Sequence, residues 1–283
     1  MPANSQLRRI IKNIGYPLLN ERSYKWLQAL SKAWDIKTGG WKEPELDLVP
    51  LGVRAGETVL DIGANYGFYS YHLAKAVGPK GKVYSFEPIP FTFATLQVVA
   101  KLLRIRNTEL IPKGCSNRNE RVSFNVPVQH SQALSAGLAH LGNREDDRPG
   151  KDIQVRWEET REISGEVVTL DSFLPPLSNL TFIKCAIEGA EFFAFSGARK
   201  LISRNLPTVI CEINPWYLQG FGVAVSDLTG FFSTLGYGLF RYDTSNKKGR
   251  LRPIHETNIV EDNYLFLHPS RGERFATVSA HTP

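Results

Sequence analysis

The residues with the clearest chemical potential follow the first predicted strand. The stretch Val59–Ser70 runs from apolar residues into Asp61, then into a turn that holds Gly63 and Gly67, and then into a helical pattern. Glycine permits positive φ angles and a close approach of a ligand to the backbone. The amides of a helix N-terminus would then face that ligand. The segment therefore predicts a small-molecule site between strand and helix.

The spacing of this turn excludes two common phosphate sites. A Walker loop ends in Gly-Lys-Ser/Thr, but Gly67 is followed by Phe68 and Tyr69. A dinucleotide fingerprint has the spacing Gly-x-Gly-x-x-Gly, but here three residues separate Gly63 from Gly67. Asp61, at the entrance of the turn, would also repel a pyrophosphate. The pattern favours a cationic ligand without phosphate.

A second acidic residue, Glu87, ends the next predicted strand, within the run Tyr84–Pro88. A carboxylate at the end of strand two can accept both hydroxyls of a ribose, because its oxygens offer several lone pairs. An adenosine-like, positively charged ligand without phosphate is S-adenosylmethionine. The two motifs together therefore predict S-adenosylmethionine as the cofactor.

These motifs resemble those of the FkbM family of class I S-adenosylmethionine-dependent methyltransferases. The resemblance is carried by Val59–Ser70, Val83–Pro88, Val168–Asp171 and Phe182–Glu191, and it covers about residues 50 to 215. It implies an α/β fold, with a Rossmann-like, seven-stranded, mostly parallel sheet and helices on both faces. It also implies O-methylation of a hydroxyl on a sugar or another secondary metabolite, as in natural product biosynthesis.

The resemblance also implies roles for individual residues. Asp61, Gly63, Asn65 and Gly67 would line the methionine part of the cofactor, and Glu87 would hold the ribose. The full set of cofactor-binding candidates is Asp61, Gly63, Ala64, Asn65, Tyr66, Gly67, Phe68, Glu87, Pro88, Gly114, Cys115 and Ser116. In this set, Gly114, Cys115 and Ser116 would lie beside the adenine.

One position departs from the family pattern. The family motif in the fourth strand is Lys-x-Asp-x-Glu-Gly-x-Glu, and Lys184, Glu188, Gly189 and Glu191 match it, but Ala186 stands at the Asp position. An Asp at the tip of a central strand could act as a general base, or could bind a Mg²⁺ ion that acidifies a hydroxyl. Alanine can do neither.

Three accounts of Ala186 remain open. It is an engineered substitution that disables the chemistry, which we favour; or a natural change in which Glu188 or Glu212 takes over; or the mark of a catalytically silent cofactor-binding module or scaffold in a biosynthetic pathway. The candidate catalytic positions are therefore Ala186, Glu188, Glu212 and Lys184, and Glu212 with Asn214 could hold a metal. We expect ligand binding without normal turnover.

Hydrophobic periodicity predicts the elements that position these residues. Apolar runs predict strands at Thr58–Ile62, Lys82–Phe86, Glu109–Pro112, Thr181–Ala186, Thr208–Ile213 and Tyr264–Leu267. Helical spacing predicts helices over Phe68–Val77, Phe91–Leu103 and from Ala190 to about Arg204. This alternation is typical of a doubly wound parallel sheet.

The chain is expected to divide into a helical extension, residues 1–50, and a methyltransferase domain, residues 51–283. Leu7–Ile14 predicts an amphipathic helix that lies on a membrane or packs on the domain, and a second periodic set follows over residues 27–34. An insertion at about residues 127–160 predicts a lid or a disordered loop, from which His130 or His140 could reach the site as a base.

Composition limits the remaining possibilities. The 283 residues, 42% hydrophobic, suffice for a core, and no apolar run is long enough to cross a membrane. Three cysteines without a Cys-x-x-Cys pair, and no signal-peptide pattern, predict a reducing, cytoplasmic setting. The net charge of +6 does not require nucleic acid, and no Asn/Asp-Pro-Pro-Tyr motif indicates base methylation. The expected partner is a small molecule, glycosylated or not, whose hydroxyl group accepts the methyl group.

Overall fold

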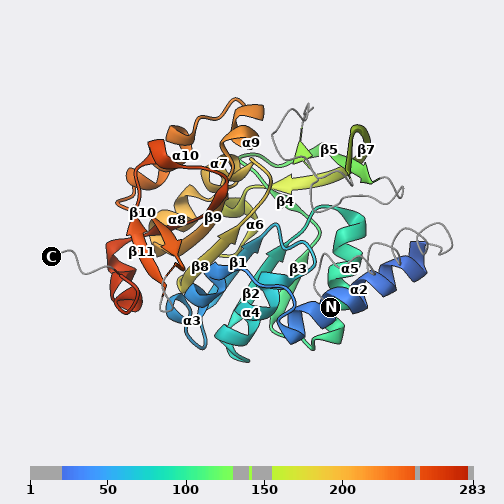
Figure 1. The fold of residues 1–283 in the computed structure, drawn as a ribbon, viewed down its shortest axis with the longest axis horizontal. Coiled ribbons are helices and arrows are strands. Elements are labelled where there is room, and N and C mark those ends of the chain that lie inside the picture. The colour runs from blue at the N-terminus through green and yellow to red at the C-terminus, as the bar shows by residue number, and fades with distance from the viewer. Residues whose placement is uncertain (1–20, 130–139, 142–154, 246–248, 280–283) are drawn as a thin grey trace.

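Eight short strands form the central sheet of the computed structural model, which describes residues 21–129, 140–141, 155–245 and 249–279 (Figure 1). Their order across the sheet is β11 (Arg250–Pro253), β10 (Gly238–Asp243), β12 (Asp262–Leu267), β9 (Thr208–Ile213), β8 (Leu180–Cys185), β1 (Thr58–Ile62), β2 (Lys82–Phe86) and β3 (Thr108–Ile111). The strands from β9 to β3 are parallel. The other three pair antiparallel.

The prediction of seven strands was therefore wrong by one. The edge strand β11 carries two arginines and a proline, and of its residues only Leu251 is buried. Such a strand lacks the apolar run by which buried strands are found, and charges and proline are usual on a sheet edge. Its place is set by antiparallel pairing with β10.

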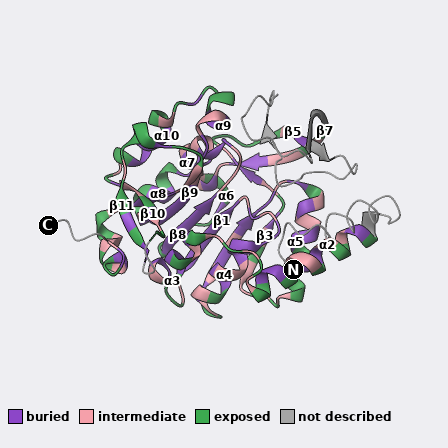
Figure 2. Cartoon of the chain, viewed as in Figure 1, coloured by how far each residue is buried: buried purple, intermediate pink, exposed green. Residues whose placement is uncertain are grey.

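The central strands are apolar because the sheet is covered on both faces. All five residues of β1 are buried, with Val59 in one hydrophobic cluster and Leu60 and Ile62 in the other. In the same way β8 turns Phe182 toward the first of these clusters and Ile183 toward the second. Successive side chains of a strand point to opposite faces, so both faces must find a cover. Figure 2 shows this buried centre within an exposed rim.

Helices supply the cover on each face. One face carries α2 (Glu21–Thr38), η1 (Pro44–Leu48), α3 (Val49–Gly52), α4 (Phe68–Val77), α5 (Pro90–Leu102) and η4 (Pro269–Phe275). The other carries α6 (Leu170–Phe173), α7 (Glu191–Ser196), α8 (Arg199–Asn205), α9 (Pro215–Gly220) and α10 (Val225–Ser233). A short turn, η3 (Glu256–Asn258), precedes β12.

The helix predicted from Ala190 to about Arg204 is in fact two helices, α7 and α8. The break falls at Gly197, where a Cβ atom would lie 2.0 Å from the carbonyl oxygen of Ser116, so the neighbouring loop leaves no room for a side chain. Asp171 of α6 then accepts the backbone N–H groups of Lys200 and Leu201, which stabilises the start of α8.

A second sheet extends into both ends of the region predicted as a loop. Its order is β4 (Gly114–Cys115), β7 (Val155–Val168), β5 (Glu120–Gln129) and β6 (His140–Leu141). The loop prediction for residues 127–160 was wrong at both ends, because β5 and β7 pair antiparallel as far as Gln129 and Val155. Residues 130–139, which include His130, lie outside the described residues, and of His140 the structure describes the backbone pairing with Asn125.

The described part of the N-terminal region, from residue 21 onward, packs directly on the core. The helix expected over Leu7–Ile14 lies outside the described residues, whereas the second periodic set falls within α2. Tyr24 of α2 stacks on Phe91 of α5, and Ala29, Ala33 and Ile36 join the hydrophobic cluster beneath. No helix in the described ranges is long and apolar enough to span a bilayer.

Candidate active site

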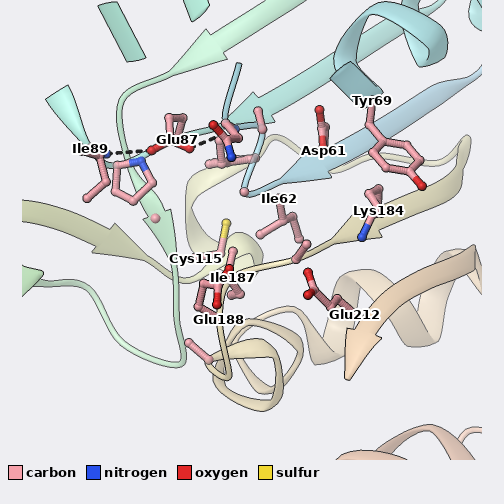
Figure 3. A pocket seen from close by; sticks show the side chains of 18 of the residues that line it. Asp61, Ile62, Tyr69, Glu87, Ile89, Cys115, Lys184, Ile187, Glu188 and Glu212 are labelled. Carbon is pink, nitrogen blue, oxygen red and sulfur yellow. Dashed lines mark hydrogen bonds between the residues drawn. The ribbon is translucent and has the colours of Figure 1, made fainter. Parts of the chain in front are cut away.

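A cavity of about 280 Å³ opens where the parallel strands end (Figure 3). Its floor is made by the carboxyl ends of β1, β2, β8 and β9, which is where parallel α/β sheets place their ligands. Across the sheet, the acidic residues at these ends follow the strand order: Glu212 on β9, Asp61 on β1 and Glu87 after β2. The cavity therefore offers acidic groups along its whole length.

The glycine-rich turn after β1 forms one wall of the cavity. Gly63 has a φ of +82°, and a Cβ atom there would lie 2.0 Å from the carbonyl oxygen of Ala186. Asn65 also has a positive φ, +47°, and Gly67 adopts +86° as the N-cap of α4. These conformations hold the turn against the tip of β8, so its shape is fixed before any ligand arrives.

Asp61 lies beneath this turn and is almost fully buried. Its Oδ2 accepts a hydrogen bond of 2.5 Å from the Ser70 hydroxyl, which is itself 2.9 Å from the Ser85 hydroxyl. Burial raises the pKa of Asp61 to about 6, although the bond from Ser70 and the charge of Lys184 oppose the rise. A cation bound in the cavity would favour the ionised form of Asp61.

Glu87 closes the opposite end of the cavity (Figure 3). Its two oxygens accept the backbone N–H groups of Asn65, at 2.9 Å, and of Ile89, at 3.0 Å. Burial raises the pKa of Glu87 to about 7, and the two amides work against that rise. Because each carboxylate oxygen has two lone pairs, both can still accept a hydroxyl, as the ribose hypothesis requires.

The wall beside Glu87 is mostly apolar and comes mainly from the second sheet. Gly114 and Cys115 of β4 line it, together with Phe124 of β5, Val167 of β7 and Ile89. An apolar slot next to a carboxylate suits an aromatic base joined to a ribose. The second sheet therefore completes the part of the cavity predicted for adenine.

The end of the cavity near β9 is polar. Lys184 is only 3% exposed, and its Nζ donates to Asn263 Oδ1 at 2.9 Å and lies 5.1 Å from the centre of the Tyr69 ring. Asn263 on β12 is paired in register with Glu212. Burial raises the pKa of Glu212, and the charge of Lys184 acts against the rise. Figure 3 shows Lys184, Glu212 and Tyr69 together, away from Glu87.

The segment after β8 crosses the centre of the cavity. Ala186 donates its backbone N–H to the carbonyl oxygen of Ile62, and Glu188 and Gly189 follow with φ values of +58° and +99°. Glu191 Oε1 accepts the N–H groups of Ile187 and Gly189, and burial raises the pKa of Glu191 to about 7. Glu191 thus supports this turn from behind, while Ala186 and Glu188 line the cavity.

Four of the predicted site residues do not line the cavity. The Tyr66 hydroxyl accepts a hydrogen bond from Gln28 of α2, and Gly67 caps α4, where a Cβ would come within 2.7 Å of Leu96. Ser116 lies beyond β4 and donates its backbone N–H to Val168. Asn214 Oδ1 accepts the N–H groups of Trp216 and Tyr217 at the start of α9. The other predicted residues do line it: Asp61, Gly63, Ala64, Asn65, Phe68, Glu87, Pro88, Gly114, Cys115, Lys184, Ala186, Glu188 and Glu212.

The motifs did not indicate several cavity residues. Trp41 and Glu43 come from the segment between α2 and η1, and the Trp41 ring stacks on Phe68 at 4.6 Å and donates to Glu43. Tyr69 and Asn263 complete the polar end. Only Tyr69 had a sequence signal, since it lies within the stretch Val59–Ser70; the other three lie outside every motif.

The donor set does not fit the expected metal. Within the described ranges, no group of three or more His, Cys, Asp or Glu side chains could hold an ion. Asn214 Oδ1, one of the two proposed ligands, is already engaged as a helix cap. The described residues therefore do not support a Mg²⁺ site in this cavity.

The residues present do fit S-adenosylmethionine. Asn65 Oδ1 is buried at the cavity wall without a hydrogen-bond partner in the described part of the chain, so it can accept a bond from a ligand's amine or hydroxyl. Gly63 and Ala64 make the neighbouring wall from backbone and one methyl group, and Glu87 is placed at the end of β2. A backbone-lined wall, an unused acceptor and a buried carboxylate are the features that this cofactor needs.

Comparison with solved structures finds methyltransferases. Methyltransferase FkbM from Methylobacillus flagellatus KT is 18% identical, with 75% of this chain and 43% of that chain covered and a TM-score of 0.45. A TehB-like S-adenosylmethionine-dependent methyltransferase from Corynebacterium glutamicum is 13% identical, with 87% and 99% covered and a TM-score of 0.45. A Streptococcus mutans protein described as a methyltransferase in complex with SAH is 10% identical, with 80% and 97% covered and a TM-score of 0.43. The chain spans less than half the length of the Methylobacillus protein.

Comparison with curated proteins finds no match. The family model described as the methyltransferase FkbM domain matches residues 61–239, from the buried Asp61 at the end of β1 to β10. The match includes the glycine-rich turn, Glu87, and the segment after β8 that carries Ala186. The chain therefore belongs to the FkbM family of S-adenosylmethionine-dependent methyltransferases.

Proposed function

We propose that this chain is an O-methyltransferase for a hydroxyl of a sugar or another secondary metabolite, and that Ala186 impairs it. One observation carries the proposal. Position 186 lies at the cavity directly after β8, between the cofactor turn and the polar end, and it presents a methyl group where the motif suggests a carboxylate. The cavity thus has groups that can bind a cofactor on one side of position 186 and an acceptor on the other, but no carboxylate at position 186 itself.

The cofactor would be held by the turn and the end of β2. In this arrangement Asn65 Oδ1 accepts from the ligand, Glu87 holds the ribose hydroxyls, and Asp61 supplies negative charge beneath the turn. When bound, S-adenosylmethionine supplies an electrophilic methyl group on a positively charged sulfur. Desolvated carboxyl groups near that sulfur favour the cation over the neutral product.

The acceptor would enter at the polar end. Lys184, Asn263 and Glu212 offer hydrogen-bond donors and acceptors that can orient a polyhydroxylated molecule. Holding a hydroxyl oxygen in line with the reacting carbon can supply much of the rate acceleration. Glu212 is the remaining carboxyl on the floor at that end, and because burial raises its pKa, its Oε atoms are more basic than those of an exposed glutamate.

The second candidate is a catalytically silent module that binds the cofactor without using it. Ala186 favours this function too, because its methyl side chain can neither accept a proton nor bind a metal. Such a protein would sense the cofactor, or would hold a biosynthetic partner. We also propose that the partner is a small molecule and not a nucleic acid. We propose a cytoplasmic location as well, and the three free, buried cysteines fit a reducing compartment.

The test compares the chain with Ala186→Asp, and with Ala186→Asn as the control of equal size without a carboxylate. Calorimetry should show that all three bind S-adenosylmethionine and S-adenosylhomocysteine. In assays against a panel of sugars and glycosides, we expect Ala186→Asp to gain methyl transfer by about a hundredfold or more, and Ala186→Asn to gain little.

Each other outcome selects a different account. No cofactor binding would overturn the whole assignment. If Ala186→Asp gains no activity with an acceptor that the unchanged chain binds, the proposal that Ala186 impairs an enzyme is wrong. The catalytically silent module then remains. Normal turnover of the unchanged chain that disappears in Glu212→Gln shows instead that Glu212 has taken over the role of base.

A further inference from the structure

The outer face of α2 carries an exposed apolar stripe. Trp26, Leu27, Leu30 and Trp34 lie on this face, and they are 44%, 43%, 52% and 63% exposed. Their spacing places them along one side of a helix. Within the described ranges seven large hydrophobic side chains are exposed, so a single helix holds four of them. A stripe of this kind marks a surface that binds something.

The opposite face of α2 attaches the helix to the domain. Tyr24, Ala29, Ala33 and Ile36 are buried against the core. The stripe is therefore not needed to attach α2 to the domain. Figure 2 shows α2 at the rim of the molecule, with exposed residues on the side away from the sheet.

The exposed charges of residues 23–42 have one sign. Over residues 23–42 there are four lysines and one acid, and that acid, Asp35, is 2% exposed. Lys37 and Lys42 are exposed near the end of the stripe, and Lys25 lies beside Trp26. Lys32 turns inward instead, with its Nζ 4.8 Å from the centre of the Trp41 ring. The surface offered to solvent is thus apolar with a cationic border.

We infer that this face docks on an anionic lipid surface. Tryptophan is favoured at the membrane interface, where its ring is partly apolar and its N–H stays hydrated, and lysines beside it pair with anionic headgroups. The arrangement lies in the plane of the interface and does not cross it. A second copy of the chain is a poorer occupant, because a symmetric contact would bring two lysine-bordered faces together.

The docked face would lie close to the cavity. Gln28 of α2 donates to Tyr66 in the glycine-rich turn, and α2 leads directly into Trp41 and Glu43, which line the cavity wall. The lipid surface would therefore be next to the site, whatever its acceptor is. The inference stands on exposure and charge alone, and does not depend on the proposed O-methylation.

The experiment measures binding of the full chain to vesicles by sedimentation and by tryptophan fluorescence. Vesicles of phosphatidylcholine with about one-fifth phosphatidylglycerol should bind the protein and shift its emission to shorter wavelength, and pure phosphatidylcholine should bind about tenfold less or weaker still. Changing Trp26→Ser, Leu30→Ser and Trp34→Ser together should weaken binding by about tenfold or more. Lys37→Glu with Lys42→Glu should weaken binding to the anionic vesicles alone.

The control changes Leu102→Ser and Val260→Ser, which are exposed apolar residues outside α2. It should bind vesicles like the parent chain, and circular dichroism should show every variant folded. Two results overturn the inference. One is dimerisation in sedimentation equilibrium that the Trp26, Leu30 and Trp34 changes abolish, without vesicle binding. The other is no vesicle binding together with protection of the α2 tryptophans from a soluble quencher, which would mean that residues 1–20 cover the stripe.

Discussion

Glu87 lies at the end of β2 with 5% of its surface exposed, and both of its carboxylate oxygens accept backbone amides. A carboxyl group in such a place is costly to ionise, and its pKa of about 7 reflects that cost. Asp61 is in a similar position, with a pKa of about 6. Buried acids whose desolvation outweighs their favourable interactions are typical of binding sites, because a ligand can supply the missing interaction.

The residue-scale prediction concerns Glu87→Gln. An amide keeps the size of the side chain but turns an N–H group toward one of the two backbone donors and loses the charge. We expect affinity for S-adenosylmethionine, measured by calorimetry, to fall by about tenfold to a hundredfold, since a hydrogen bond to a charged group contributes about 1.5–3 kcal/mol.

The matched control for that change is Glu109→Gln. Glu109 is an exposed residue of β3 that pairs with Lys82 at 3.0 Å, outside the cavity. Affinity should stay within about twofold in this variant, because exposed ion pairs contribute little. Equal losses in both variants would show that Glu87 acts through the general charge of the protein and not through contact.

At the scale of elements, the turn between β1 and α4 depends on contact with β8. Gly63 N and Ala64 N both donate to the carbonyl of Phe86 on β2, and Gly63 faces the carbonyl of Ala186. The turn is thus held by the neighbouring strand on each side. A loop that is fixed in this way loses little conformational entropy when a ligand binds, which favours affinity.

Gly63→Ala tests this contact. The new Cβ would lie 2.0 Å from the Ala186 carbonyl oxygen, so the strand ends must separate. We expect the free energy of unfolding in urea to fall by about 3 kcal/mol or more, and cofactor binding to be lost. Gly56→Ala is the control, because Gly56 has a φ of +86° but no atom within 4 Å of the new Cβ. In this control the free energy of unfolding should fall only by the cost of a positive φ angle in alanine, about 1 kcal/mol. Equal losses in the two variants would show that the contact with Ala186 is not the cause.

Sequence patterns predicted the elements that are buried on both faces. β1, β2, β9 and α4 have the predicted bounds, because apolar runs and helical spacing between turn residues indicate such elements directly. The antiparallel pair β5 and β7 and the edge strand β11 were missed, since many of their residues are polar; in addition, β5 and β7 are far apart in sequence. The same reason hides Trp41, Glu43 and Asn263: tertiary packing alone brings them to the cavity.

For the whole molecule, buried acids set the dependence of stability on pH. In the folded state the pKa values are about 6 for Asp61 and about 7 for Glu87 and Glu191, above their usual values of 3.8 and 4.5. Between about pH 4 and 7 the folded state therefore holds more protons than the unfolded state, and the free energy of unfolding falls as pH rises. His72, whose pKa is lowered by burial, acts in the opposite direction below about pH 6.5 but is a single group.

We expect urea unfolding without cofactor to show a loss of a few kcal/mol between about pH 5 and pH 8. Glu87→Gln should flatten the profile, because it removes one of the buried acids whose pKa is raised. A free energy of unfolding that stays constant or rises over the same range would contradict the prediction.

The backbone at position 186 is held independently of its side chain. The amide of Ala186 bonds to Ile62, and its carbonyl occupies the space that Gly63 leaves open. Alanine and aspartate codons can differ by a single nucleotide. A one-base mutation can therefore exchange a methyl group for a carboxylate at the cavity while the glycine-rich turn keeps its contacts. Under the proposed function, such a mutation would convert a binding protein into a transferase, or the reverse, without a change in the fold.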